Sequence, residues 1–510
     1  MFESINGLDV FVTVIAVYIV YRSYHSSSHG PLPPGPKGLP LIGNLDLPQT
    51  YFWTKYAEIG QTYGDIWSTS ALGRRFVILN SRRHLIDMLE KRHAIYDDRH
   101  DVHMITEIAG WNQATVFMPP NAEWKDQRKH FSRMFGTRTL MAKWQDTQMW
   151  ETRRFVRNVM RKPEALEDHI RYWAGAMILK IVYGYDIKPG HDPLVEIVDE
   201  AMSQWIYLSR PGAYMVDFFP WLAYIPSWFP GATFKREGKK FRKTLDDLIH
   251  EPFKIVQAQM NQGTAPPSYV SNILSADDYT PDQEWSVKAS AATVGAAGAD
   301  TTATQVHGFF LVMLLWPDAQ RKAQEEIDRV VGTDRLPTFS DRDRLPYVEA
   351  LLKECLRLHT SVPISGPRRA LQDDVQDGYF IPKGSLIQPN PWAIAHDPEL
   401  YPDPLNLVPE RWLVDDPPPH PREYIFGFGR RICPGMIMAD TSFWIASVLT
   451  LALLDINPTK DSPKAGAFTH GEGGLLDGKT ICHPKPFSCS ITPRSRKAEE
   501  LILAVEHEEA

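Results

Sequence analysis

The sequence FGFGRRICPG at residues 426–435 contains one cysteine, Cys433, together with three glycines, a proline and two arginines. Glycines permit backbone conformations and close approaches that a Cβ would prevent, so the segment can lie flat against another group and direct its sulfur toward it. A thiolate beside Arg430 and Arg431 is stabilised as an anion, the form that binds a metal. No second or third ligand follows at zinc-site spacing, which argues against tetrahedral zinc. One thiolate suffices where another molecule supplies the remaining metal ligands.

The other three cysteines, Cys355, Cys482 and Cys489, show no Cys-x-x-Cys spacing with one another or with Cys433. Lone cysteines usually serve as small buried hydrophobic residues, and we interpret these three in that way. Four cysteines in 510 residues indicate no disulfide framework and are typical of a reducing compartment. We therefore expect the globular part of the chain in the cytosol.

The pattern Phe426-x-x-Gly429-x-Arg431-x-Cys433-x-Gly435 resembles the haem-binding loop of the cytochrome P450 family, and every position of that signature is present. The resemblance implies a mostly α fold with a minor β part, built as a single large haem-binding domain. It also implies that Cys433 is the axial ligand of the iron of haem b and that Arg431 binds a haem propionate. Phe426 and Gly435 are the other residues of this loop assigned to the haem. A thiolate ligand favours O–O bond cleavage in this family.

Glu354 and Arg357 lie three residues apart on a predicted helix, so the carboxylate and the guanidinium share one face. Most such pairs are exposed and of little energetic value, which is the ordinary interpretation of the pattern alone. Arg411, within Pro409–Trp412, stands where the family carries its second arginine motif. The resemblance implies that Glu354, Arg357 and Arg411 form a structural triad that holds the haem loop and takes no part in the chemistry.

Trp124 and Arg128 resemble the family's Trp-x-x-x-Arg helix, in which one helical turn brings an indole N–H and a guanidinium to the same haem propionate. Arg368 stands where many microsomal members carry a histidine or an arginine that binds a propionate. Arg369 follows directly, and the sequence leaves the choice between these two arginines open. We assign Arg368 to the haem.

The segment Ala289–Ala303 consists mostly of alanine, glycine and threonine, which would let a helix backbone pass close to a flat ring. The usual meaning of such a run is a tightly packed core helix. An acid and hydroxyls inside an apolar run are costly unless they are paired or used. Ala297-Gly298-x-Asp300-Thr301 resembles the central-helix signature of the family. The resemblance implies that Asp300 and Thr301 deliver protons during oxygen activation.

An uncharged and mostly apolar run covers Val10–Tyr21, twelve residues, and extends back to Ile5 if Asp9 is tolerated. Twelve residues are short for a membrane span, whereas about 17 reach the lower limit. Acidic residues precede the run and Arg22 follows it, without the basic start or the small-x-small site of a cleaved secretory signal. We expect an N-terminal membrane anchor that leaves the rest of the chain in the cytosol.

The chain shows no internal repeat and divides by composition. Five prolines in Pro31–Asn44 prevent a helix and form a stiff spacer. We therefore expect four parts: a membrane anchor and flank at residues 1–29, a proline-rich hinge at 30–50, a haem-thiolate domain at 51–495 and a charged tail at 496–510.

Helical patterns dominate the predicted domain. Ala319–Val331 and Tyr347–His359 are predicted helices, because both combine helix formers with start or stop residues. Tyr379–Asn390 predicts two short strands around a Pro-Lys-Gly turn, and Phe76–Leu79 is a further β-like run. The formal charge of -7 gives no reason to expect a nucleic-acid partner.

Aromatic residues are concentrated between Trp205 and Phe234, with prolines among them. Two interpretations stay open for this aromatic segment. It is either a loop packed in the core or a loop that dips into a membrane or admits substrate, since amphipathic rings favour the bilayer interface.

The resemblance implies a haem-thiolate monooxygenase that inserts one atom of O2 into an apolar small molecule, with electrons from an NADPH-dependent reductase. It implies the endoplasmic reticulum membrane as location, with the catalytic domain on the cytosolic face. Residues 216–232 and 392–404 resemble fungal secondary-metabolism members. Two alternatives stay open: a haem-thiolate isomerase or dehydratase that needs no reductase, and a non-catalytic haem-binding or sensor protein.

Two surfaces are expected from family position. The pocket walls are Val102–Phe117, the aromatic segment, Ala292–Thr301, Val362–Ser365 and Gly473–Leu476. A basic surface that could dock an acidic flavoprotein is formed by Lys125, Arg128, Lys129 and Arg430. For each of these four residues a solvated charged face is an equally ordinary interpretation.

Overall fold

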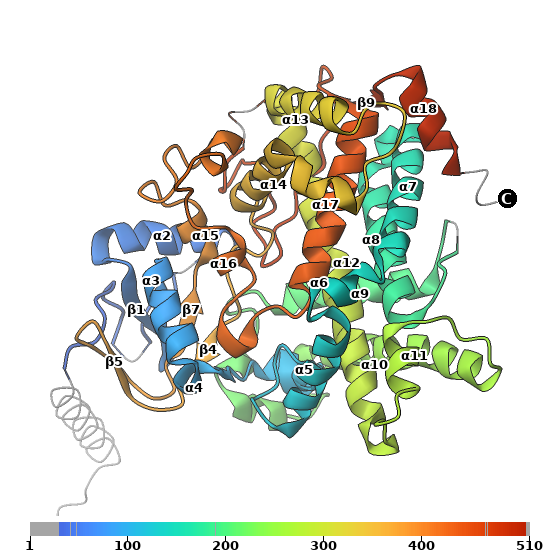
Figure 1. Ribbon diagram of the computed structural model, residues 1–510. Coiled ribbons are helices and arrows are strands. Elements are labelled where there is room, and N and C mark those ends of the chain that lie inside the picture. The colour runs from blue at the N-terminus through green and yellow to red at the C-terminus, as the bar shows by residue number, and fades with distance from the viewer. Residues whose placement is uncertain are drawn as a thin grey trace, which may run out of the picture.

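The computed structural model describes residues 30–40, 42–46, 48–188, 190–464, 466 and 468–505. The predicted anchor at residues 1–29 lies outside the described residues. The described part is mostly helical with a smaller β part, which confirms the predicted class. Figure 1 shows most strands gathered beside α2 (Phe52–Tyr63), at one side of the molecule, while β9 (Ser490–Pro493) lies apart from them, among the helices near α18 (Arg496–Leu503).

A helix of 32 residues, α12 (Glu284–Leu315), runs through the helical part and organises it. It is apolar around its whole circumference over most of its length, and a helix of this kind belongs in the interior. It packs against α8 (Leu166–Tyr183), α17 (Met436–Leu453) and α5 (Ala122–Phe135). Any site formed where these helices meet is therefore enclosed by protein.

The small residues of Ala289–Ala303 lie in the middle of α12. At Gly298 a Cβ would lie 2.8 Å from Cδ1 of Ile178 on α8, so a larger residue would push the two helices apart. One face of the run is thus a tightly packed core contact, which is the ordinary meaning of such a sequence. Another face lines a cavity, described below.

Two predicted helices are present as α13 (Pro317–Val330) and α14 (Pro346–Leu358). Each begins with a proline. The first N–H groups of a helix have no acceptor within the helix, so a proline at this position costs no hydrogen bond. At the start of α14 the carboxylate of Glu326 accepts hydrogen bonds from the backbone N–H groups of Tyr347 and Val348, at 3.1 and 2.9 Å. The further α-helices are α3 (Arg82–Leu85), α4 (His93–Tyr96), α6 (Arg138–Ala142), α7 (Gln145–Arg161), α9 (Pro193–Leu208), α10 (Thr233–Asn261), α11 (Tyr269–Leu274), α15 (Pro391–Ala395), α16 (Arg422–Ile425) and α18 (Arg496–Leu503).

The main sheet has the strand order β1-β2-β7-β4-β3. These strands are β1 (Ile66–Ala71), β2 (Arg74–Leu79), β3 (Asp98–Arg99), β4 (Arg368–Arg369) and β7 (Leu386–Pro389). The predicted run Phe76–Leu79 lies in β2 and pairs in parallel with β7. The two strands expected in Tyr379–Asn390 exist as β6 (Tyr379–Ile381) and β7, but they belong to different sheets, because β6 pairs with β5 (Asp374–Gln376). A third sheet joins β8 (Leu454–Asn457) to β9.

Glu354 is the centre of a fully buried polar cluster that ties α14 to the chain after α15. Its carboxylate accepts from Arg357 at 2.6 and 3.0 Å and from Nε of Arg411 at 3.1 Å. It also accepts from the indole N–H of Trp412 at 2.9 Å. Arg357 then donates to three backbone carbonyls, those of Ala395, Pro404 and Asn406. The structure thus brings the three predicted triad residues together, and it shows which backbone they hold.

Replacing Arg357 by alanine should destabilise the protein strongly, because the Glu354 carboxylate would stay buried without its partner. The expected loss is about 3–5 kcal/mol of unfolding free energy, measured by thermal or urea unfolding. Arg321→Ala is the matched control, since Arg321 pairs with Asp318 at the same i,i+3 spacing, at 3.0 Å, but with both side chains exposed. A similar small effect of both substitutions would contradict the structural role of the cluster.

Candidate active site

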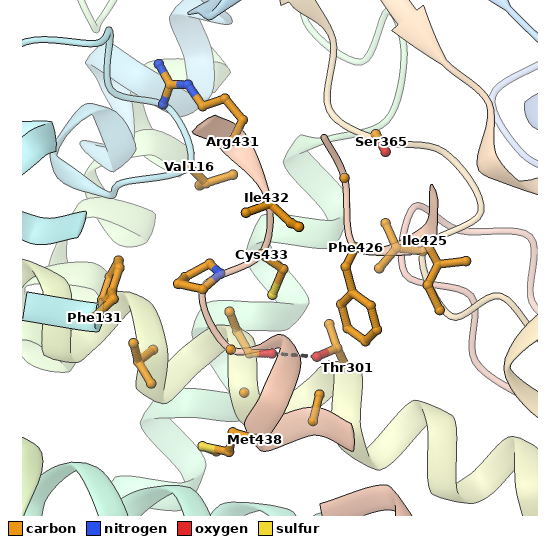
Figure 2. A pocket seen from close by; sticks show the side chains of 18 of the residues that line it. Val116, Phe131, Thr301, Ser365, Ile425, Phe426, Arg431, Ile432, Cys433 and Met438 are labelled. Atoms are coloured by element: carbon orange, nitrogen blue, oxygen red, sulfur yellow. Dashed lines mark hydrogen bonds between the residues drawn. The ribbon is translucent and has the colours of Figure 1, made fainter. Parts of the chain in front are cut away.

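An internal cavity of about 380 Å³ lies between α12, α5, the cysteine segment 426–435 and the chain that follows α14. Apolar side chains make up most of its surface, among them Phe131, Val294, Val362, Ile425 and Met438. Cys433 and Thr301 both line this cavity (Figure 2). A mostly apolar cavity with a few polar groups is the usual form of a small-molecule or cofactor site.

The cysteine segment follows a path that only glycine allows at two positions. Gly427 and Gly429 have φ angles of 83° and 56°, in the left-handed region. At Gly429 a Cβ would lie 2.5 Å from the carbonyl oxygen of Leu89, so the segment packs directly on that backbone. The backbone N–H of Cys433 donates to the carbonyl of Phe426 at 2.8 Å, which closes the loop. The sulfur is thereby held at the cavity wall, just before α17 begins.

Burial raises the pKa of the Cys433 thiol, while a hydrogen bond from the backbone N–H of Gly435 and the charge of Arg128 act in the opposite direction. The two arginines beside it in the sequence do not stabilise the thiolate as expected. Arg431 points away from the sulfur (Figure 2), and Arg430 pairs with the carboxylate of Asp97. A buried thiol of this kind becomes an anion when a cation binds it directly, which fits a metal ligand.

Three guanidiniums lie on one wall of the cavity: those of Arg368 and Arg431 are buried, and that of Arg99 is half-buried. They donate mainly to neutral backbone carbonyls: Arg431 to Asp97 at 2.8 Å and Met118 at 2.8 Å, Arg368 to Phe428 at 2.8 Å, and Arg99 to Gly366 at 2.7 Å. Burial lowers the pKa of Arg99 and Arg431 to about 9 and that of Arg368 to about 10. Nε of Arg99 and Nη1 of Arg368 have no hydrogen-bond partner within the described chain. Nη1 of Arg368 is 3.9 Å from Oδ1 of Asp97, a carboxylate that Arg430 also pairs with. The wall still has more guanidiniums than carboxylates, and it suits an anionic group such as a carboxylate.

The structure separates the two neighbouring arginines of β4. Arg368 is buried and lines the cavity, whereas Arg369 is half exposed and pairs with the carboxylate of Asp98. The pairing of β3 with β4 places Arg99 opposite Arg368 and Asp98 opposite Arg369. Because side chains alternate along a strand, Arg99 and Arg368 reach the cavity together. Asp98 and Arg369 pair with each other instead, which neutralises their charges.

Trp124 and Arg128 lie one turn apart on α5, and both line the cavity. Nη1 of Arg128 donates to the carbonyl of Ile432 at 2.8 Å, directly before Cys433. The guanidinium of Arg431 lies over the Trp124 ring, 4.5 Å from its centre. The predicted haem residues of α5, β4 and the cysteine segment thus converge on one place.

Thr301 and Asp300 are neighbours in sequence but face different surroundings. Thr301 lines the cavity, and its hydroxyl donates to the carbonyl of Ala297 at 2.8 Å (Figure 2). Asp300 is buried and is not among the residues that line the cavity. Its carboxylate lies 3.3 Å from Nε2 of His483 and 3.6 Å from Nη1 of Arg171. Successive residues of a helix point about 100° apart, so the two expected proton carriers do not lie side by side at the cavity.

Three of the five expected pocket walls contribute to the cavity, through residues such as Val116, Thr293 and Ser365. Within the described chain, the aromatic segment and Gly473–Leu476 contribute none of its lining residues. Part of the aromatic segment lies at the surface, where Trp221 is 62% exposed. Tyr214 and Val216 of the same segment are buried in the main core, so the segment is partly a core loop and partly a surface loop.

Sequence reasoning missed Arg99, Gln305 and Ser361, which also line the cavity. The hydroxyl of Ser361 donates to the side-chain oxygen of Gln305 at 2.7 Å, which connects α12 to the chain after α14. Arg99 could have been found only from the pairing of its strand with β4, since it belongs to no short motif. Gln305 stands one turn after Thr301 on α12, and helical spacing was the signal for it.

Residues 33–475 match the sequence profile of the cytochrome P450 family. The chain belongs to this family. Cytochrome P450 monooxygenase 208 of Postia placenta is 43% identical over 509 residues, which cover 98% of this chain and 98% of that protein. Cytochrome P450 monooxygenase claR of Ampulloclitocybe clavipes is 40% identical and covers 98% of this chain and 92% of its own length. A solved zebra fish cytochrome P450 with progesterone, 20% identical, matches 86% of this chain and 99% of its own with a TM-score of 0.70, which shows a shared fold.

This P450 is a monooxygenase of the oxidoreductase class, as its curated relatives are, and the family implies haem iron. The residues fit haem b on two observations. The Cys433 sulfur lies at the cavity wall with no cationic side chain bonded to it, and Arg99 and Arg368 present to the same cavity guanidinium nitrogens that lack a hydrogen-bond partner in the described chain and that suit carboxylates. Cys433 would ligate the iron, and Arg99, Arg368 and Arg431, with Trp124 and Arg128, would hold the propionates.

Cys433→Ser should abolish the red-shifted Soret band of the reduced CO complex that marks a thiolate ligand, because a serine hydroxyl does not replace a thiolate. Cys489→Ser is the matched control, since Cys489 is a partly buried cysteine outside the cavity lining, and it should keep the band. Absorbance spectra of the purified proteins provide the measurement. A thiolate band that persists in Cys433→Ser would exclude this ligand.

Proposed function

We propose that this P450 inserts one atom of O2 into an apolar small molecule, using electrons delivered by an NADPH-dependent reductase, in fungal secondary metabolism. The observation that carries the proposal is that Cys433 and the Thr301 hydroxyl line the same mostly apolar cavity. Bound haem would supply the redox-active iron at which O2 is activated. The likeness of residues 216–232 and 392–404 to secondary-metabolism members supports the metabolic role.

The cavity lining supports an apolar substrate. Phe131, Val294, Val362 and Ile425 present hydrocarbon surface to it. Binding to such a surface releases water and favours a substrate with a large apolar skeleton. The pair formed by Ser361 and Gln305 is the polar part of the wall near the chain after α14. An apolar skeleton with few polar groups matches this lining.

Thr301 is the residue of this chain best placed to handle a proton inside the cavity. Its hydroxyl donates to the carbonyl of Ala297, so its oxygen can accept a hydrogen bond from a water molecule in the cavity. A water held in this way is shielded from bulk solvent by the surrounding apolar residues. Thr301 therefore positions a proton donor at a defined place in the cavity.

Two exposed lysines support the proposed reductase contact. Lys125 and Lys129 lie on the outer face of α5, one turn apart. Arg128 and Arg430 were expected in the same surface, but Arg128 bonds to the carbonyl of Ile432 and Arg430 pairs with Asp97. We propose that the two lysines attract an acidic flavoprotein to the side of α5 nearest the cysteine segment.

We propose that the protein is bound to the endoplasmic reticulum membrane by its N-terminus, with the aromatic segment as a second contact. Trp221, Tyr224 and Trp228 are 62, 89 and 78% exposed. Tryptophan and tyrosine favour the membrane interface, where their rings are half wet. Leu39 and Leu45, in the described part of the hinge, are also exposed.

Within the described residues, one helix is long and apolar enough to cross a membrane, and this is α17. Most of it is buried inside the protein, directly after the cysteine segment. It is therefore a core helix, and the proposed membrane contact does not depend on it.

Thr301→Ala should keep the CO spectrum and the consumption of NADPH with reductase, but lose proton delivery. Product formed per NADPH should fall by about tenfold or more, and released peroxide should rise in proportion. Thr293→Ala is the matched control, because Thr293 lies on the same helix, lines the same cavity and also bonds to the carbonyl four residues earlier. Turnover without NADPH and O2 would favour the isomerase, and a protein that turns over no substrate would favour the sensor.

A protein shortened to residues 30–510 should leave the membrane pellet in part while still binding haem, because the apolar N-terminal run is lost. Adding Trp221→Ser and Trp228→Ser should release more of it, since two interfacial rings are removed. Leu413→Ser with Val414→Ser, two exposed apolar residues outside the aromatic segment, is the control and should release no more. Full-length protein that stays in solution without detergent would contradict the anchor.

A further inference from the structure

Asp300 is buried on a side of α12 that does not face the cavity, although the mechanism needs an acid near Thr301. Its side chain is 6% exposed. Its two carboxylate oxygens lie near different partners: Oδ2 is 3.3 Å from Nε2 of His483, and Oδ1 is 3.6 Å from Nη1 of Arg171. Neither partner belongs to a motif of the sequence. The acid is therefore connected to two residues to which no role has been assigned.

His483 is held against α12 by contacts on both its backbone and its ring. Its backbone N–H donates to the carboxylate of Asp477 at 3.1 Å, and its backbone carbonyl accepts from the N–H of Asp477 at 2.9 Å. Its ring lies 3.0 Å from the hydroxyl of Thr304, which itself donates to the carbonyl of Asp300 at 2.8 Å. The imidazole is thus held against α12 by Thr304 and Asp300, two residues that lie one helical turn apart.

The two partners of Asp300 differ in what they can do with a proton. The guanidinium of Arg171 stays protonated in proteins, so it can hold the carboxylate but cannot supply a proton to it. An imidazole can both give and take a proton near neutral pH. The ring of His483 is 14% exposed, more than the 6% of Asp300, so it lies nearer to solvent than the acid. Between the two partners, His483 is the one through which a proton can enter.

We propose that His483 is a positioning residue that holds Asp300 and replaces the proton that Asp300 gives up during turnover. This inference rests on the proposed monooxygenase function. In the step, the Nε2–H bond of the imidazolium breaks, and an O–H bond forms on Oδ2 of Asp300. The imidazole becomes neutral, the carboxyl group becomes neutral, and solvent then reprotonates the ring.

Charged groups and two further imidazoles surround His483. Asp300 and His307 on α12, His359 beside α14 and Asp477 in its own segment lie near His483. Asp477 also pairs with Lys479, while Arg171 on α8 approaches Asp300 and pairs with Glu167 as well. Asp199 on α9 lies near Asp300 and Arg171. Burial lowers the pKa of His307 to about 3 and that of His359 to about 4, so both neighbouring imidazoles stay neutral. Asp300 is therefore the carboxylate in direct contact with the His483 ring, and the two neighbouring imidazoles carry no charge that would compete with it.

The test compares two substitutions of His483 in the full-length holoenzyme with reductase. His483→Gln keeps an N–H donor that can reach Asp300 but cannot pass a proton between two atoms, whereas His483→Phe removes both abilities. Both should lower the product formed per NADPH several-fold and should flatten its dependence on pH. The control is His191→Gln, because the His191 side chain is 87% exposed and belongs to the surface near α9, and it should behave as wild type.

A second measurement needs no turnover. Thermal unfolding of the ferric protein is compared for His483→Gln, Asp300→Asn and the double variant, and the shifts of the midpoints should not add, because the residues contact each other. Additive shifts, or a His483→Gln enzyme with the coupling and pH profile of wild type, would overturn the proposal. If wild type forms no product with NADPH and O2, the proposed function fails, while the unfolding cycle still decides the contact.

Discussion

The position of the Cys433 sulfur in the wall of a mostly apolar cavity is the constraint on which the rest of the site depends. A buried thiol resists ionisation, and the two influences that oppose burial here, the N–H of Gly435 and the charge of Arg128, leave its pKa raised. The anion would then depend on a metal ion in contact with the sulfur, which haem would supply. The glycine path of the cysteine segment fixes the sulfur, and the cluster around Glu354 fixes the backbone at Ala395, Pro404 and Asn406.

The same logic applies to the arginines of the cavity wall. Buried guanidiniums are expensive to desolvate unless they are paired. Arg99, Arg368 and Arg431 reduce that cost by donating to backbone carbonyls, and their remaining donors are left for an anionic ligand. The wall is left with more guanidiniums than carboxylates, and the two propionates of haem would balance that charge. Apo protein should accordingly be less stable than protein with haem, as for any ligand that binds the folded state.

Local spacing in the sequence was enough to predict the residues that converge here. The cysteine segment, the Trp124–Arg128 turn and the Glu354–Arg357 turn each depend on a few neighbouring residues, and the structure brings each to the expected neighbourhood. The directions of side chains were not predictable in this way. Arg430 and Arg431 stand beside Cys433 in sequence yet bond elsewhere, because the tight turn at Gly429 rotates them off the sulfur. Arg99 depends on a strand pairing between segments 269 residues apart, Arg99 and Arg368, which no local pattern contains.

The position of Asp300 shows why one helix can serve two purposes. A cavity that excludes water protects its chemistry, but it also excludes the protons that the chemistry consumes. Placing Thr301 on the cavity face of α12 and Asp300 on another face lets the same turn of helix touch an apolar chamber and a polar cluster. The polar cluster includes a histidine nearer to solvent and a fixed arginine, neither of which opens the chamber itself. With the proposed function, protons would reach the site through side chains, while bulk water and the charges that accompany it would stay outside.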